Sequence, residues 1–366
     1  METNVDPNQI PALKPLRVNG EAVSKASPAR SRMKISRRLA RWILLASVSL
    51  PLGVLALGGT YQAVKSRSDA LRFPREGRLI DIGGYRLNLN CKGQGQPTVI
   101  LEAGLTVPAI SWRPVQREVS GFARVCSYDR AGYDWSDPGP LPRTSERSMR
   151  ELHTLLRAAG ESPPYFLVGH SFGGTNVRIY NWLYPDDVAG MILVEPGHED
   201  LKLPDHVQQA FDATVRAERA GLARGAFLYR FGFSRFQARN RIDDPGLPFD
   251  KQEWAYFDIQ PKYHEAVTSE LENLDQGKAA LRNAGTLGDK PLIVLIAKES
   301  LLDLPLPDED KAGMNKTWVE LEKSLIKLSG HGKWVMVDGT THMVPLERPD
   351  AIVAAIREMA GGARAH

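Results

Sequence analysis

The segment LVGHSFGG, residues 167–174, constrains the fold of this chain more than any other stretch. A short apolar run at 165–168 predicts a buried strand, and a helical pattern at 175–183 begins just beyond it. The G-x-S-x-G spacing sets glycines on both sides of Ser171, where side chains would collide with the strand and the helix. Such a turn presents a hydroxyl above a sheet and aims a helix N-terminus at it. We therefore predict a nucleophilic serine at position 171.

Residues 42–61 form the longest apolar stretch, twenty residues without a charged side chain. A helix of that length spans about 30 Å, the thickness of a bilayer's hydrocarbon core. Six basic residues precede it and favour a cytoplasmic N-terminus: Arg30, Arg32, Lys34, Arg37, Arg38 and Arg41. We expect a disordered basic cytoplasmic tail at 1–41 and a transmembrane helix or signal anchor at 42–61, with the catalytic domain outside the cytoplasm.

Two other interpretations of residues 42–61 stay open. The segment has the features of a cleaved secretory signal, particularly if translation starts at Met33, and the protein would then be secreted. It would otherwise be a buried core helix. A membrane anchor and a cleaved signal would both place the catalytic domain outside the cytoplasm.

The net charge of +4 is unevenly distributed along the 366 residues. Residues 1–78 hold 14 Lys and Arg against 5 Asp and Glu, a net of +9, so the other 288 residues carry about −5. The main body thus has no electrostatic signature of nucleic-acid binding, and we expect no nucleic-acid partner.

From residue 78 onward, predicted strands and helices alternate. A hairpin at 78–82 and 86–91 precedes apolar runs at 98–102, 124–128, 165–168 and 191–194. The clearest helix is 145–159, with its cap region at 144–146. Short apolar strands between helices indicate an α/β protein, a mostly parallel sheet with helices on both faces.

This alternation is interrupted at residues 199–287, which are helical and rich in aromatic side chains. Strand character returns at 291–297, and a helix at 316–328, a strand at 333–337 and a helix at 350–359 follow. A helical block inserted between two strands predicts a lid over an active site. The alternative is an accessory layer without a gating role.

The chain from about residue 77 to 360 resembles the α/β-hydrolase fold family. Residues 128–137 (YDRAGYDWSD) are similar to the family's D-x-R-G-x-G-x-S loop, with Asp134 where glycine is usual, so that the backbone there is expected to differ. Residues 99–105 and 111–115 resemble the oxyanion strand and loop, with Ala103-Gly104 in place of His-Gly. The resemblance implies a hydrolase core at 77–198 and 288–361, a helical lid at 199–287, and oxyanion N–H donors at Leu105 and Phe172.

The same resemblance implies a histidine base after the last strand. Of eight histidines, only His342 has that position, in a glycine, two residues, histidine pattern before a helix. His170 flanks the nucleophile and is expected to be a packing or pocket-lining residue, whereas His198 and His331 are expected in loops or at the surface.

The acid is less sharply specified. Glu195 ends the strand before the insertion and precedes a proline, as in some lipases of the family, and we favour it. The commoner family site follows the strand at 291–297, where Glu299 and Asp303 are the alternatives. Glu195 would otherwise be a carboxylate that caps a helix or loop. The order Ser171, Glu195, His342 matches the family's serine, acid, histidine.

These residues predict a serine hydrolase that cleaves a small-molecule carboxylic ester or related acyl compound through an acyl-enzyme. An acyltransferase and a non-catalytic ligand-binding protein on the same fold are the alternatives. Serine at the elbow argues against haloalkane or epoxide opening, which use a carboxylate nucleophile in this fold. No metal-binding motif is present, and we expect no cofactor.

The family fold would also make the strands that carry Cys91 and Cys126 neighbours. A disulfide within the chain would then close a loop of about 35 residues.

Overall fold

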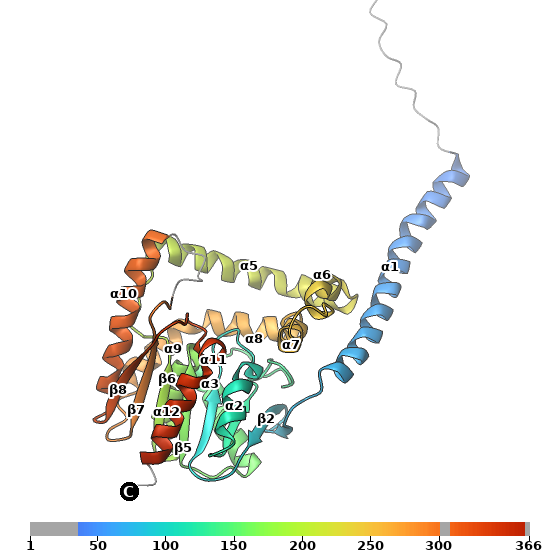
Figure 1. The fold of residues 1–366 in the computed structure, drawn as a ribbon. Coiled ribbons are helices and arrows are strands. Elements are labelled where there is room, and N and C mark those ends of the chain that lie inside the picture. Colours follow the sequence, from blue (N-terminus) through green and yellow to red (C-terminus); the bar gives the residue numbers. More distant parts are fainter. Residues whose placement is uncertain (1–35, 301–307, 363–366) are drawn as a thin grey trace, which may run out of the picture. The chain divides into compact units, whose positions relative to one another are not determined.

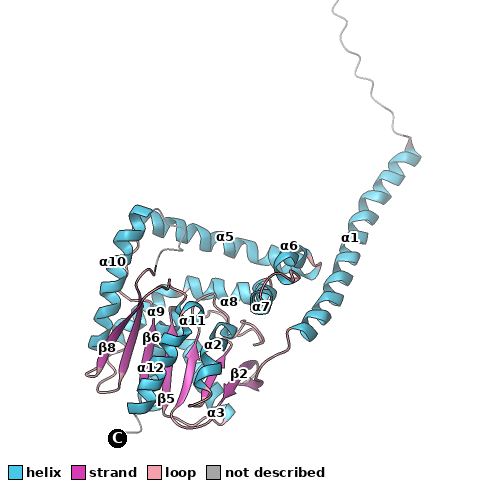
Figure 2. Ribbon diagram, viewed as in Figure 1, coloured by secondary structure: helices cyan, strands magenta, loops and turns pink. Residues whose placement is uncertain are grey.

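A single eight-stranded sheet forms the centre of the computed structural model, which describes residues 36–300 and 308–362 (Figure 2). The strand order is β1-β2-β4-β3-β5-β6-β7-β8; β1 and β2 pair antiparallel, as do β2 and β4, and every later pairing is parallel. The strands are β1 Arg78–Asp81, β2 Arg86–Lys92, β3 Thr98–Glu102, β4 Val125–Tyr128, β5 Tyr165–His170, β6 Val188–Val194, β7 Leu292–Ala297 and β8 Gly332–Val337.

Helices cover both faces of this sheet because the central strands are apolar on both sides (Figure 1). In β5, for example, Leu167 packs into the core on one face, whereas Phe166 and Val168 pack into the core on the other. The first face is covered by α3 (Ser145–Ala159), α4 (Phe172–Leu183) and α9 (Leu274–Asn283). The second face is covered by α2 (Arg113–Val119), α11 (Val344–Glu347) and α12 (Pro349–Gly362). The mostly parallel sheet with helices on both faces, predicted from the sequence, is confirmed.

Between β6 and β7 the chain forms five consecutive helices, α5–α9, which we call the helical insertion. Its first four helices are α5 (Asp205–Arg230), α6 (Phe233–Ile242), α7 (Phe249–Asp258) and α8 (Pro261–Glu272). The long helices α5 and α8 run alongside each other above the sheet (Figure 1). After β7, helix α10 (Asp308–Ser324) precedes β8.

Most predicted elements have the expected positions, with shifted ends. Helix α3 has the predicted bounds, and the Thr144 hydroxyl caps it by accepting from the Arg147 N–H at 3.2 Å. Helix α4 begins at Phe172, directly after Ser171, instead of at 175. The predicted helix at 316–328 begins earlier, as α10, and its last four residues form a 3-10 turn.

The N-terminal apolar segment forms part of a longer helix, α1 (Arg37–Arg72). Residues 40–72 are long and apolar enough to cross a membrane, and none of the most apolar stretch is buried. The chain divides into two units, Met1–Leu52 and Gly53–His366, so the end of α1 belongs with the hydrolase domain. The predicted tail at 1–41 lies almost wholly outside the described residues.

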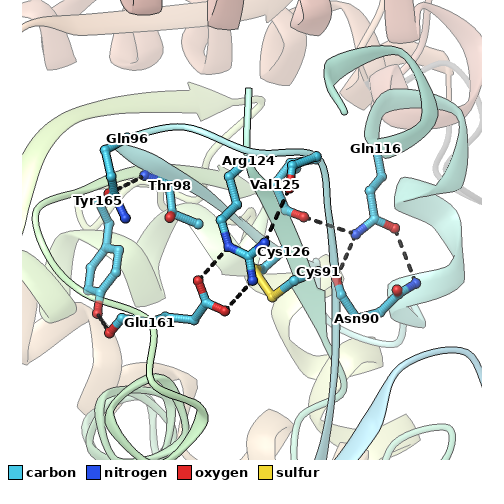
Figure 3. The surroundings of a disulfide bond; sticks show 11 residues. Asn90, Cys91, Gln96, Thr98, Gln116, Arg124, Val125, Cys126, Glu161 and Tyr165 are labelled. Atoms are coloured by element: carbon cyan, nitrogen blue, oxygen red, sulfur yellow. Dashed lines mark hydrogen bonds and ion pairs between the residues drawn. A yellow bond between two sulfur atoms is a disulfide. The ribbon is translucent and has the colours of Figure 1, made fainter. Parts of the chain in front are cut away.

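Cys91 and Cys126 lie opposite each other in the antiparallel pair β2–β4, with their sulfur atoms 2.03 Å apart in a disulfide (Figure 3). Beside them Arg124 forms a bidentate ion pair with Glu161, with N–O distances of 2.6 and 2.7 Å. The bond joins the antiparallel edge of the sheet to its parallel part.

Candidate active site

Ser171 occupies the tight turn between β5 and α4. Its φ of 54° is a backbone conformation that non-glycine residues rarely adopt, as a strained elbow requires. A Cβ on Gly169 would overlap the backbone of Gly173, and one on Gly173 would overlap the Glu102 carbonyl. Both glycines are therefore required by close backbone approach, as the sequence pattern indicates.

The rest of the turn is held by backbone hydrogen bonds. The Ser171 N–H donates to the Val194 carbonyl at 3.0 Å, and the Ser171 carbonyl accepts from Gly174 and Gly197 at 2.8 and 3.1 Å. These bonds fix the elbow to the end of β6, the strand that leads to Glu195.

The structure brings Glu195 and His342 together. Glu195 follows β6, has a φ of 48° and is completely buried, whereas His342 lies in the loop between β8 and α11. The His342 Nδ1 is 3.2 Å from the Glu195 Oε2, and this nitrogen donates if it carries the ring proton. The Glu195 carboxylate also accepts from the Ala297 N–H and the Ser300 hydroxyl. A buried carboxylate with three donors is well held to orient an imidazole.

Neither alternative acid has such a position in the described part of the chain. Glu299 is exposed, and Asp303 lies outside the described residues. The end of β7 and the turn after it still contribute to the site, because the Ala297 N–H and the Ser300 hydroxyl donate to Glu195.

His170, next to the nucleophile, holds the backbone of His342. Its Nε2–H donates to the His342 carbonyl at 2.8 Å, and the two rings lie 5.0 Å apart. Burial, with a smaller contribution from His342, lowers the pKa of His170 to about 3, so the imidazole is neutral at physiological pH. His170 therefore packs as expected and in addition links the backbone of His342 to the turn that carries Ser171.

The predicted oxyanion donors lie at the same place. Leu105, Ser171 and Phe172 line one cavity, and Phe172 begins α4, where the first N–H groups of a helix lack partners within it. The loop before Leu105 is fixed by Arg130, which donates to the Ala103 and Gly104 carbonyls at 2.7 and 2.9 Å.

Asp134 stands where glycine is usual in the similar family loop. Its φ is 35°, so the aspartate adopts the left-handed conformation that favours glycine. The buried carboxylate accepts from the Ala109 N–H at 3.0 Å, and Lys262 of α8 donates to the Asp134 carbonyl at 2.5 Å. These bonds stabilise a conformation that glycine would adopt without them.

The cavity above Ser171 has a volume of about 640 Å³. The helical insertion supplies much of its wall. The lining combines apolar with polar and charged side chains, and the larger apolar ones include Leu105, Leu201, Phe211, Val215, Leu271 and Trp318. His198 does lie in a loop, but it is buried and lines this cavity. Trp318 of α10 lines it too, and its ring meets the His342 ring edge-on at 5.8 Å. No local sequence pattern predicts that His198 and Trp318 line this cavity.

Glu322 of α10 is a second carboxyl buried behind the site. It is fully buried and lies close enough to Glu195 and Trp318 to interact with both side chains. Burial first, and the charge of Glu195 second, raise the pKa of Glu322 well above its usual value. Burial therefore favours the neutral, protonated form of the Glu322 carboxyl.

The described residues contain one group of side chains close enough to share a metal ion, Cys91, Cys126 and Glu161. Its two sulfur atoms are bonded to each other and its carboxylate pairs with Arg124, so the group is already satisfied.

Comparison with known proteins identifies the fold family. Residues 99–355 match the model of the alpha/beta hydrolase family. An uncharacterised protein of Bacillus subtilis, YqjL, is 21% identical over 272 residues, which are 73% of this chain and 85% of that protein.

Two solved structures have the same fold. An esterase from Thermogutta terrifontis superimposes with a TM-score of 0.57 at 19% identity, over 79% of this chain and 99% of the esterase. A putative epoxide hydrolase from Pseudomonas aeruginosa superimposes with a TM-score of 0.58 at 17% identity, over 80% and 97% of the two chains. The strained serine elbow, the sheet that carries it and the match over residues 99–355 together lead to one assignment: the chain belongs to the alpha/beta hydrolase family.

Proposed function

We propose that this protein is a serine hydrolase that cleaves a carboxylic ester, or a related acyl compound, through an acyl-enzyme on Ser171. The hydrogen bond between His342 and the buried Glu195, beside a serine on a strained elbow, carries the proposal. Family neighbours include both an esterase and a putative epoxide hydrolase, so the fold alone leaves the reaction open. The serine nucleophile favours acyl chemistry.

In the proposed mechanism each residue acts at one atom. The Ser171 Oγ attacks the acyl carbonyl carbon while the His342 Nε2 takes the hydroxyl proton. The N–H groups of Leu105 and Phe172 stabilise the oxyanion, and Glu195 holds the imidazole and stabilises its charged form without being protonated. His342 then protonates the leaving alkoxide, and water activated by the same histidine cleaves the acyl-enzyme.

We further propose that residues 42–61 anchor the protein in a membrane by a single pass, with the hydrolase domain outside the cytoplasm. The basic residues before this segment and the exposure of the most apolar stretch of α1 support the anchor. The disulfide supports an oxidising compartment, because cytosolic proteins rarely keep one. Cleavage after the apolar segment would give a secreted enzyme instead.

Covalent labelling tests the nucleophile. We expect a fluorophosphonate probe to label the detergent-solubilised full chain, and the Ser171→Ala variant to stay unlabelled with an unchanged circular dichroism spectrum. Hydrolysis of p-nitrophenyl butyrate by the same preparations separates an enzyme from a binding protein. Absence of labelling in the folded wild-type chain would contradict the proposal.

The acid is tested by Glu195→Gln beside Glu299→Gln. Glutamine keeps the shape of Glu195 but cannot stabilise the imidazolium, and we expect turnover to fall by about 10³-fold or more. Glu299→Gln, at an exposed position, serves as the matched control and should leave turnover unchanged. The reverse pattern would move the acid to Glu299.

A further inference from the structure

A second cavity lies next to the first along helix α5. It has a volume of about 550 Å³, and Arg219 lines both cavities. Along α5, Phe211 and Val215 line the first cavity, and Leu222 and Ala226 line the second. From residue 211 to residue 226 the helix rises about 22 Å. The two cavities thus follow one another under a single helix, away from Ser171.

Helix α8 accompanies α5 along the same path in the opposite direction. Its last residues, Leu271 and Glu272, line the first cavity, whereas Pro261 and His264 near its start line the second. At the junction Arg219 pairs with Glu272 at 3.5 Å. Both side chains of this pair are partly exposed, so the pair is weak and its arginine can swing aside.

The far end of the second cavity reaches the corner between α5 and α6, where Ala226 and Ser234 line it. This corner packs against α1. A Cβ on Gly58 would overlap the Phe231 carbonyl, and one on Gly232 would touch the Tyr61 ring. The second cavity therefore ends beside residues 58–61, the last residues of the predicted membrane segment.

Further along, α1 is fixed to α6 and α7 by polar contacts. Asp69 and Arg235 form an ion pair in which both side chains are almost fully buried, and Arg72 donates to Gln252. Lys65 pairs with Asp243 at 3.5 Å. A buried pair of this kind is costly to break, so the corner cannot separate easily from this part of α1.

The surface of the corner has the composition of a membrane interface. Phe227, Phe233 and Phe236 are each about half exposed, although such side chains are usually buried. Exposed Arg230 and Arg239 accompany them, and the Arg239 guanidinium lies 4.1 Å above the Phe236 ring. Aromatic side chains that enter lipid, together with arginines that meet anionic headgroups, are typical of interfacial helices.

We propose that the α5–α6 corner lies in the headgroup layer of the membrane that α1 crosses, and that the substrate is a long-chain ester that reaches Ser171 from this layer through the two cavities under α5. The proposal rests on the proposed ester hydrolysis and on the membrane segment. The first cavity holds the reacting acyl group, and the second holds the distal part of its chain.

The path is tested with two substrates and one pair of variants. The full chain is reconstituted in vesicles of phosphatidylcholine and phosphatidylglycerol, with soluble p-nitrophenyl butyrate or vesicle-embedded p-nitrophenyl palmitate as substrate. Ala226→Trp places a large side chain in the second cavity, whereas Ala217→Trp makes the same change at an exposed position of α5 that lines neither cavity. We expect Ala226→Trp to lower palmitate turnover at least about tenfold, with both variants near wild type on butyrate.

A second variant guards against misfolding of the first. Gly221 lines the second cavity, and a Cβ there would meet no atom within 4 Å, so Gly221→Trp should fold and also slow palmitate turnover. Palmitate turnover at the wild-type rate in both cavity variants would overturn the proposed path. Failure of the wild type on butyrate would instead contradict the ester hydrolysis itself.

The membrane contact is tested by replacing Phe227, Phe233 and Phe236 together with serine. We expect turnover of vesicle-embedded palmitate to fall while turnover of butyrate stays unchanged. Trp182→Ser, which removes an exposed aromatic side chain from α4, is the control. Unchanged palmitate turnover in the triple variant would show that the corner does not contact lipid.

Discussion

Replacing Arg130 with methionine should both destabilise the protein and slow it, because this one side chain joins three parts of the site. It is almost fully buried and pairs with Glu102 of β3 at 3.2 Å and with Glu270 of α8 at 2.8 Å. It also donates to the carbonyls of Ala103 and Gly104, which precede the proposed oxyanion donor Leu105. Methionine fills a similar volume but removes the charge and every one of these bonds.

The expected loss of stability follows from the groups left behind. Removing one partner of a buried ion pair costs about 3–5 kcal/mol, because the remaining charge has no counterion. Here Glu270 keeps only the Tyr133 hydroxyl, at 2.6 Å, among its present charged and polar partners. Two carbonyls also lose their donors, so we place the cost at the upper end, about 5 kcal/mol, a large part of a typical folding free energy.

A double variant tests the cause. Glu270→Gln removes the stranded charge, so Arg130→Met/Glu270→Gln should be more stable than Arg130→Met alone, by about 1–3 kcal/mol. The matched control is Arg150→Met, which breaks an exposed pair with Glu146 at 2.8 Å and should cost about 0.5 kcal/mol or less.

The measurements are denaturant unfolding of the detergent-solubilised chain and turnover of p-nitrophenyl butyrate. If the oxyanion loop loses its geometry, turnover of folded Arg130→Met should fall by up to about 10²–10³, the effect of one lost oxyanion donor. Two results would refute this reasoning: an unfolding free energy within about 1 kcal/mol of wild type, or additive losses in the double variant.

Three further predictions use the disulfide and the two buried titratable groups. Replacing Cys91 and Cys126 together with serine should lower the unfolding free energy by about 4 kcal/mol, since the bond spans 35 residues, and dithiothreitol should then have no further effect in denaturant unfolding. Glu322 has a raised pKa, so the folded state keeps a proton that the unfolded state releases as the pH rises above about 4.5. Above that pH the wild type should lose stability relative to Glu322→Gln by up to about 1.4 kcal/mol per pH unit. Equal pH profiles of the two proteins would contradict the burial of a neutral acid. His170 has a pKa lowered to about 3, so as the pH falls below about 6.5 the unfolded state binds a proton before the folded state does. Between neutral pH and pH 5 the wild type should therefore lose about 2 kcal/mol of stability relative to His170→Gln. Acid unfolding curves of the two proteins that run parallel would exclude a neutral buried His170.

The parts of the site that the sequence predicted are those set by local patterns. The elbow at Ser171 follows from two glycines and the apolar run before them. Glu195 and His342 each follow the C-terminal end of a strand, on the same side of the sheet as the C-terminal end of β5. Because parallel strands end at the same edge, their positions along the chain suffice to bring them near one another.

The parts that the sequence did not predict depend on packing between distant segments. Trp318 and Glu322 lie on α10, whose sequence has the composition of an ordinary charged helix, and only its packing against β7 brings them to His342 and Glu195. Residues after Tyr61 likewise give no sign that α1 continues to Arg72. Their helix is stabilised by contacts such as Asp69 with Arg235, which lie 166 residues apart in the chain.

The two helices that enclose the cavities differ in how firmly they are held. Helix α8 is fixed to the core by the buried ion pair of Glu270 with Arg130. Partly buried hydrogen bonds add to it, from Lys262 to the Asp134 and Ser136 carbonyls and from the Tyr263 hydroxyl to the Thr106 carbonyl. Helix α5 has no fully buried residue along its 26 residues. Since local opening occurs where few apolar groups are buried, movement that admits a substrate should occur in α5. The insertion then combines a fixed floor that positions the oxyanion loop with a movable roof whose far end contacts α1.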